Sequence, residues 1–113
     1  MESTDLDFSD QNAASFLKYI KSQYIRSKVS KASLYEQLAE EASELAQACL
    51  KKARKLRGEN YTPKSMQEID DNVIEEYTDV ILSAKICDLS INEDLEYYKL
   101  QRWATRIKNN IND

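Results

Sequence analysis

The chain has 113 residues, of which 32% are charged and 42% hydrophobic, and its formal net charge is −4. This length suits one domain, and the composition is that of a folded rather than a disordered protein. A single glycine and a single proline exclude an all-β fold, which needs many tight turns. The sequence therefore predicts one all-α domain over residues 1–113, with residues 1–8 frayed.

The absence of histidine excludes several kinds of site. Ser-His-Asp and Cys-His catalysis both need an imidazole, as do zinc sites of the Cys₂His₂ type. Two cysteines, Cys49 and Cys87, are too few for a disulfide framework, so we expect two small buried thiols in a cytoplasmic protein, with a pairing between them left open. No apolar stretch is long enough for a membrane span and no strongly basic run is present, so we expect neither a membrane nor a nucleic-acid partner.

Apolar residues at helical spacing predict four helices with short connections. The first covers roughly residues 11–29, with Asp10 as its N-cap. The second opens with a capping box formed by Ser33 and Glu36 and ends at Gly58, the only glycine.

A second capping box, Ser65 with Glu68, opens the third helix, which reaches about Cys87. Asn92 caps the fourth helix, which carries Trp103 among its apolar residues. Four helices with short connections predict a four-helix bundle-type domain.

Two octapeptides, residues 38–45 and 73–80, share one arrangement of acids. Each has two adjacent acids, two other residues and a third acid, with an apolar residue at each end. In the first segment the acids are Glu40, Glu41 and Glu44. In the second they are Glu75, Glu76 and Asp79.

The acids interrupt two apolar stripes. Glu41 lies within a stripe of the second helix made of Leu34, Leu38, Leu45 and Ala48. Glu76 lies at the matching point of a stripe of the third helix made of Ile69, Val73, Val80 and Ser83. Glu44 and Asp79 follow one turn later on nearly the same faces. If the two stripes pack together, four carboxylates converge.

Converging carboxylates cannot all stay ionised in a site of low dielectric constant without a cation. Since no histidine is available, the metal should be one that prefers oxygen ligands, such as Mg²⁺, Mn²⁺ or Ca²⁺. We therefore predict a metal site at Glu41, Glu44, Glu76 and Asp79. Glu40 is the candidate to orient or deprotonate a water, and either Glu40 or Glu75 could instead be a solvated surface group.

The paired motifs, Glu40-Glu41 with Glu44 and then Glu76 with Asp79, resemble the signature of the MazG-like all-α nucleoside triphosphate pyrophosphohydrolases. That superfamily also includes dimeric dUTPases, dCTP pyrophosphatases and phosphoribosyl-ATP pyrophosphohydrolases. The resemblance covers roughly residues 30–108. It implies an enzyme that uses Mg²⁺, with Mn²⁺ as a possible substitute, to hydrolyse a nucleoside or deoxynucleoside triphosphate to a monophosphate and pyrophosphate in nucleotide-pool housekeeping.

The resemblance also implies a homo-oligomer, a dimer or tetramer, with the nucleotide pocket shared between subunits. Cations must then bind the polyphosphate, and the candidates are Lys51, Lys52, Arg54, Lys85, Lys99, Arg102 and Arg106. Tyr61, Tyr77 and Trp103 could stack a base, although aromatic residues at helical spacing are more often core.

Two alternatives stay open at this point. One is a phosphoribosyl-ATP pyrophosphohydrolase, which shares the metal site and differs in substrate. The other is a non-catalytic helical module whose acids bind Mg²⁺ or a basic partner. Turnover separates the module from both enzymes, and the substrate profile separates the two enzymes.

Overall fold

The computed structural model describes the backbone of residues 3–59 and 63–112, and the side chains of residues 11–59 and 63–110. Within these ranges the chain forms four α-helices and no strand: α1 (Ser3–Lys28), α2 (Lys31–Arg57), α3 (Met66–Ile86) and α4 (Glu93–Asn112). The all-α prediction is thus confirmed for the described part of the chain. None of these helices is both long and apolar enough to cross a membrane.

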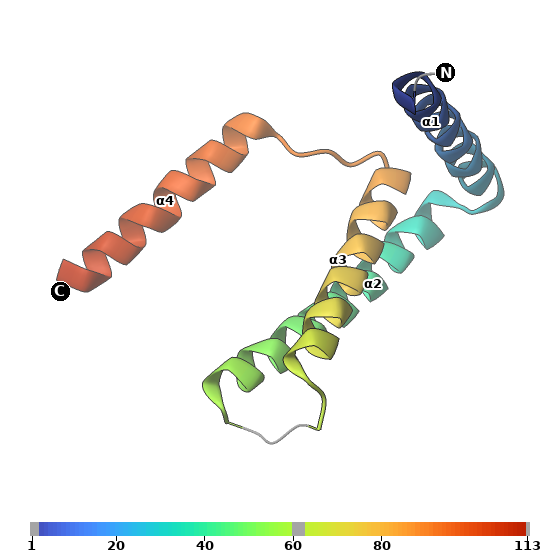
Figure 1. Ribbon diagram of the computed structural model, residues 1–113. Coiled ribbons are helices and arrows are strands. Elements are labelled where there is room, and N and C mark those ends of the chain that lie inside the picture. Colours follow the sequence, from blue (N-terminus) through green and yellow to red (C-terminus); the bar gives the residue numbers. More distant parts are fainter. Residues whose placement is uncertain (1–2, 60–62, 113) are drawn as a thin grey trace.

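The helices pack unequally. α2 and α3 form an antiparallel hairpin with extensive contact, α1 contacts α3 to a small extent, and α4 extends away from the other three (Figure 1). α1 begins at Ser3, so Asp10 lies inside the helix instead of capping it, and the described residues of the segment expected to be frayed are helical. Nothing between Ser3 and Asp10 is glycine or proline, so no residue there stops the helix from extending.

The N-cap of α2 is Ser30, whose Oγ accepts a hydrogen bond from the Ser33 N–H at 3.1 Å. The predicted capping box of Ser33 and Glu36 is therefore wrong, because Ser33 already occupies the first turn of a helix that starts at Lys31. The C-terminal end of α2 agrees with the prediction. Gly58 has φ +69°, and its N–H donates to the Lys55 carbonyl at 3.2 Å, as a left-handed C-cap requires.

The capping box at the start of α3 is confirmed. The Ser65 Oγ accepts from the Glu68 N–H at 3.2 Å, while Glu68 Oε1 accepts from the Ser65 N–H at 3.3 Å. The cap of α4 is confirmed too, because the Oδ1 atom of Asn92 accepts from the Leu95 N–H at 3.0 Å. Both helices therefore begin where the sequence predicts.

An arginine from α1 closes the other end of α3. The Arg26 guanidinium donates to the carbonyl of Ile86 at 3.0 Å and to that of Lys85 at 2.9 Å, and it lies 3.3 Å from the Asp88 carboxylate. The last carbonyls of a helix have no partner within the helix, so a cation there satisfies both their hydrogen bonds and the helix dipole. Arg26 thereby links α1 to α3.

The core of the hairpin consists of the two predicted stripes. Each of their apolar members is buried or half-buried, and the most buried side chains are Ala48, Ile69 and Ile86, at 2%, 5% and 6% exposure. Glu41 and Glu76 are half-buried within the same interface. The thiols are free, but Cys49 is exposed and Cys87 is half-buried, so the expectation of two buried thiols is wrong. Cys49 follows Ala48 directly and so points about 100° away from the interface.

Candidate metal centre

Three of the four predicted metal ligands come together where α2 packs against α3. Glu41 and Glu44 of α2 and Glu76 of α3 each offer a carboxylate oxygen, and these oxygens all lie within 4.8 Å of one another. Glu41 and Glu44 are neighbours because residues three apart share a helix face. Glu76 joins them because it interrupts the α3 stripe that faces α2. The structure therefore places the acids as the paired stripes predict.

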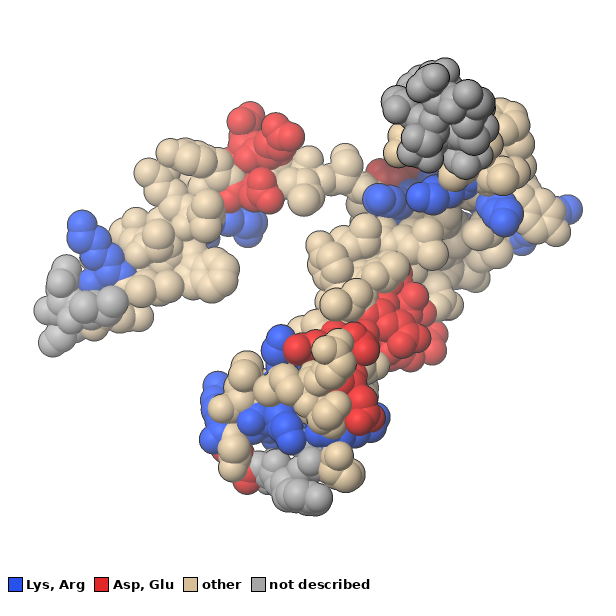
Figure 2. Space-filling view, viewed as in Figure 1, with Lys and Arg blue, Asp and Glu red and all other residues tan. Residues whose placement is uncertain are grey.

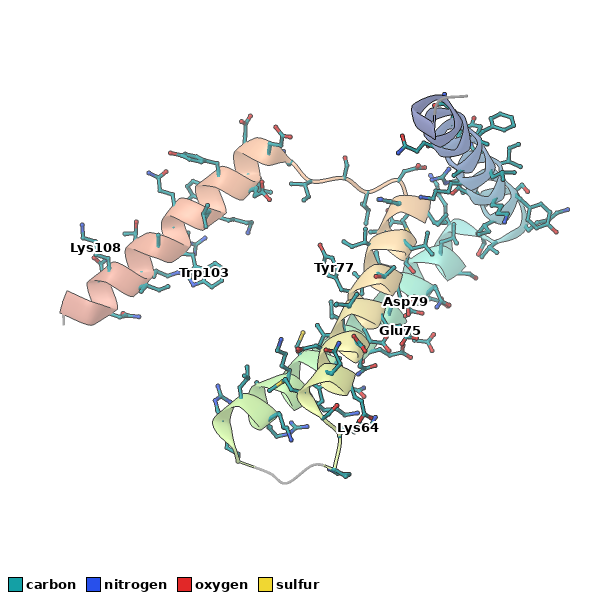
Figure 3. The ribbon with its side chains drawn as sticks, in the orientation of Figure 1. Lys64, Glu75, Tyr77, Asp79, Trp103 and Lys108 are labelled. Atoms are coloured by element: carbon teal, nitrogen blue, oxygen red, sulfur yellow. The ribbon has the colours of Figure 1, made fainter. Side chains whose placement is uncertain are left out.

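Asp79 lies beside this triad of Glu41, Glu44 and Glu76 without completing it. It is half-buried on α3, and its charge contributes to raising the pKa of Glu41, so the two carboxyl groups are close. Its oxygens nevertheless do not belong to the set of carboxylate oxygens that all lie within 4.8 Å of one another. Figure 3 shows Asp79 and Glu75 on one side of α3, with Tyr77 pointing away on the other side.

Two carboxylate oxygens of the triad are buried and lack a hydrogen-bond partner among the described residues: Glu41 Oε2 and Glu76 Oε2. The second oxygen of Glu41 accepts a hydrogen bond from Gln37 Nε2 at 2.7 Å. An unpaired buried carboxylate oxygen loses its hydration without compensation, which is unfavourable. A bound cation at this point would satisfy both oxygens.

The crowding also shifts the titration of the triad. Burial raises the pKa of Glu41, and the charges of Glu44, Asp79 and Glu40 add to the shift against the opposing hydrogen bond from Gln37. The charge of Glu76 is the largest cause that raises the pKa of Glu44, and burial adds to it. Repulsion between the acids is thus the main cause at Glu44 and a smaller one at Glu41, where burial comes first, and a divalent cation would relieve it.

Glu40, the candidate to handle a water, is exposed on α2. Its charge contributes to raising the pKa of both Glu41 and Glu44, so it lies near the triad without belonging to it. Glu75 is exposed on α3. Glu40 thus borders the acidic triad on its solvent side, whereas no such proximity is shown for Glu75.

The predicted phosphate-binding cations lie in three different places. Lys51, Lys52 and Arg54 occupy the carboxyl-terminal part of α2, beyond the acidic triad. Lys52 is already engaged, since its Nζ lies 2.7 Å from Asp70 Oδ1. Figure 2 shows acidic surface midway along the α2–α3 hairpin and basic surface towards both ends of it.

The remaining cations are not at the triad in this single chain. Lys85 lines a groove between α1 and α3, together with Lys18 and Lys21, which the sequence analysis missed because they lie far from the acidic motifs in sequence. Lys99, Arg102 and Arg106 are exposed on α4, which extends away from the hairpin (Figure 1). The structure therefore brings the acids together without these four cations.

The two described aromatic candidates for base stacking, Tyr77 and Trp103, line different hollows of this chain. Tyr77 and Trp103 are exposed, at 56% and 60%, on α3 and α4 respectively. The third candidate, Tyr61, lies outside the described residues. Gln37, which binds Glu41, was also missed, although its position one turn before Glu41 could have indicated the contact.

Comparison with known proteins gives no match to a family model, a curated protein or a solved structure. The resemblance to the MazG-like superfamily therefore depends on the two acidic motifs alone.

Proposed function

We propose that this chain is a Mg²⁺-dependent nucleoside triphosphate pyrophosphohydrolase with a bundle-type domain of the all-α pyrophosphohydrolase kind. The observation that carries the proposal is the convergence of Glu41, Glu44 and Glu76 in a helix interface. Solvated glutamates do not need to face one another. These three do, and two of their oxygens are buried without a hydrogen-bond partner among the described residues.

The residues present fit a hard divalent cation. Glu41, Glu44 and Glu76 would hold Mg²⁺ with oxygen ligands alone, and Asp79, whose charge acts on Glu41 from α3, would add negative charge beside the ion. Mn²⁺ accepts the same ligands and is the expected substitute. When bound, the ion would supply positive charge against the phosphate oxygens and lower the pKa of a water.

The side chains around the triad would accept the proton of the attacking water and bind the leaving group. Glu40 would accept the proton of the water that attacks the α-phosphorus, while the bond from that phosphorus to the bridging oxygen of the β-phosphate breaks. Lys51 lies seven residues beyond Glu44, about 10 Å along α2, and together with Arg54 would bind the departing pyrophosphate. Lys52 is paired with Asp70, so we assign it to holding the hairpin together.

The decisive experiment measures pyrophosphate release from a panel of canonical, deoxy and modified nucleoside triphosphates, with Mg²⁺ and with EDTA. Phosphoribosyl-ATP belongs in the panel, because preference for it would indicate the alternative enzyme. We expect release that needs Mg²⁺ and a monophosphate as the second product. Mg²⁺ binding without turnover of any compound would favour the non-catalytic module.

Three variants connect the activity to the site. Glu41→Gln keeps the size of the side chain and an oxygen that can accept from Gln37, but it removes a ligand charge, and we expect kcat/KM to fall at least about a hundredfold. Glu40→Gln should lower kcat by about a hundredfold while Mg²⁺ binding persists. The matched control is Glu36→Gln, an exposed acid on the same helix, which should leave activity unchanged. Full activity in Glu41→Gln would refute the proposal.

A further inference from the structure

The two oxygens of the Glu41 carboxylate have different surroundings. Glu41 Oε1 accepts a hydrogen bond of 2.7 Å from Gln37 Nε2, whereas Glu41 Oε2 is buried and has no hydrogen-bond partner among the described residues. The two oxygens of a free carboxylate are equivalent, so the fold imposes this difference. The hydrogen bond from Gln37 therefore determines which oxygen of Glu41 stays available to a cation.

Gln37 has two sets of neighbours that place it for this contact. It lies four residues before Glu41 on α2, where a glutamine and an acid share one face of the helix. It also lines a hollow of about 170 Å³ together with Ile25 of α1 and with Leu82 and Ile86 of α3. Apolar side chains of two other helices thus border Gln37, and Glu41 supplies a partner for its amide.

Hard divalent cations differ in how they use a carboxylate. Ca²⁺ accepts about six to eight oxygens in a flexible geometry and can take both oxygens of one carboxylate. Mg²⁺ is smaller and demands nearly ideal octahedral geometry, to which a carboxylate contributes a single oxygen because its two oxygens are too close together to fill two positions. An acid that has one oxygen held by a hydrogen bond is therefore better suited to Mg²⁺ than to Ca²⁺.

We infer that Gln37 is a positioning residue, which holds Glu41 Oε1, leaves Oε2 as the one oxygen that Glu41 offers, and so shifts the preference of the site from Ca²⁺ towards Mg²⁺. This role rests on the proposed function, because it needs a cation at the triad of Glu41, Glu44 and Glu76. Side chains that bind a metal ligand without touching the ion orient that ligand and strengthen its hold on the metal.

The variant that tests this role is Gln37→Met, which removes the amide and keeps an unbranched side chain of similar length. The matched control is Gln67→Met on α3, because Gln67 Nε2 donates to Asp71 Oδ1 at 2.9 Å across the same four-residue spacing. Gln67 lies nine residues before Glu76, about 14 Å along the helix. Each variant thus loses one hydrogen bond between a glutamine and an acid, and only Gln37→Met loses it at the triad.

Isothermal titration calorimetry of the metal-free proteins with Mg²⁺ and, separately, with Ca²⁺ gives two dissociation constants for each protein. We expect Gln37→Met to raise the Kd for Mg²⁺ about tenfold. The Kd for Ca²⁺ should stay the same or fall, because Glu41 can then turn both of its oxygens to the larger ion. Gln67→Met should keep both constants of the wild type.

The outcomes distinguish failure of the metal site from failure of this role. If Mg²⁺ does not bind the wild type, the metal site is refuted and the role of Gln37 with it. If Mg²⁺ binds the wild type and Gln37→Met equally, or if the variant weakens Mg²⁺ and Ca²⁺ by the same factor, the metal site stands and the role of Gln37 is overturned. A metal-free Gln37→Met that melts well below Gln67→Met would assign Gln37 to packing in the hollow, and it would overturn that role as well.

Discussion

Replacing Glu44 by glutamine should make the metal-free protein more stable and the Mg²⁺-loaded protein less stable. Glu44 is exposed, so the substitution changes charge and leaves helix packing alone. Folding brings carboxylate oxygens of Glu44 and Glu76 within 4.8 Å of each other, and the charge of Glu76 raises the pKa of Glu44. Glutamine removes that repulsion, so without metal its melting temperature should exceed that of the wild type.

With Mg²⁺ bound, the wild type should have the higher melting temperature of the two proteins. A ligand present at a hundred times its Kd stabilises the folded state by about 2.7 kcal/mol. For a chain of this length that corresponds to a rise in melting temperature of about 10 °C. The Glu44→Gln site keeps two of the three clustered carboxylates, so at the same Mg²⁺ concentration we expect a rise less than half as large.

Thermal unfolding followed by circular dichroism at pH 7.5, with EDTA and with a Mg²⁺ titration, measures both effects. Glu36→Gln is the control, because it removes one negative charge from the same helix away from the triad, and its curves should follow the wild type. The reasoning fails if the Mg²⁺ titration moves wild type and Glu44→Gln equally, or if the variant is the less stable protein in EDTA.

Three further outcomes follow from the structure. The pKa values of Glu41 and Glu44 are raised above their ordinary value of 4.5 in the folded chain, so at a pH between the ordinary and the raised values the folded chain binds more protons than the unfolded chain. The melting temperature of the metal-free protein should therefore fall as the pH rises through this window. A melting temperature that does not change with pH there would contradict this prediction. Arg26→Met removes the hydrogen bonds to the carbonyls at the end of α3 and should cost about 2 kcal/mol in urea unfolding, whereas no loss would mean that Arg26 does not hold α1 against α3. Gly58→Ala should cost about 1 kcal/mol through its positive φ alone, since nothing lies within 4 Å of an added Cβ, and Gly58→Asn should cost less.

The hairpin was predictable because its signals are local and periodic. Ser65 with Glu68 and the lone Gly58 mark helix ends through hydrogen bonds within a few residues. Glu41 and Glu76 could be recognised because each takes the place of an apolar residue in a regular stripe. When the two stripes pack together, the two acids are brought face to face. The sequence was therefore sufficient to predict the meeting of these two acids.

The N-cap of α2, the position of Asp79 and the partner of α4 could not be decided from the sequence alone. Ser30 and Ser33 are both good N-caps, and the presence of Glu36 favours the wrong one, because a capping box is not needed when Ser30 already binds the first turn. Asp79 was expected beside Glu76, but aspartate is one methylene shorter than glutamate, which agrees with its oxygens falling outside the triad. The amphipathic pattern of α4 predicts that the helix needs a partner without saying which surface supplies it.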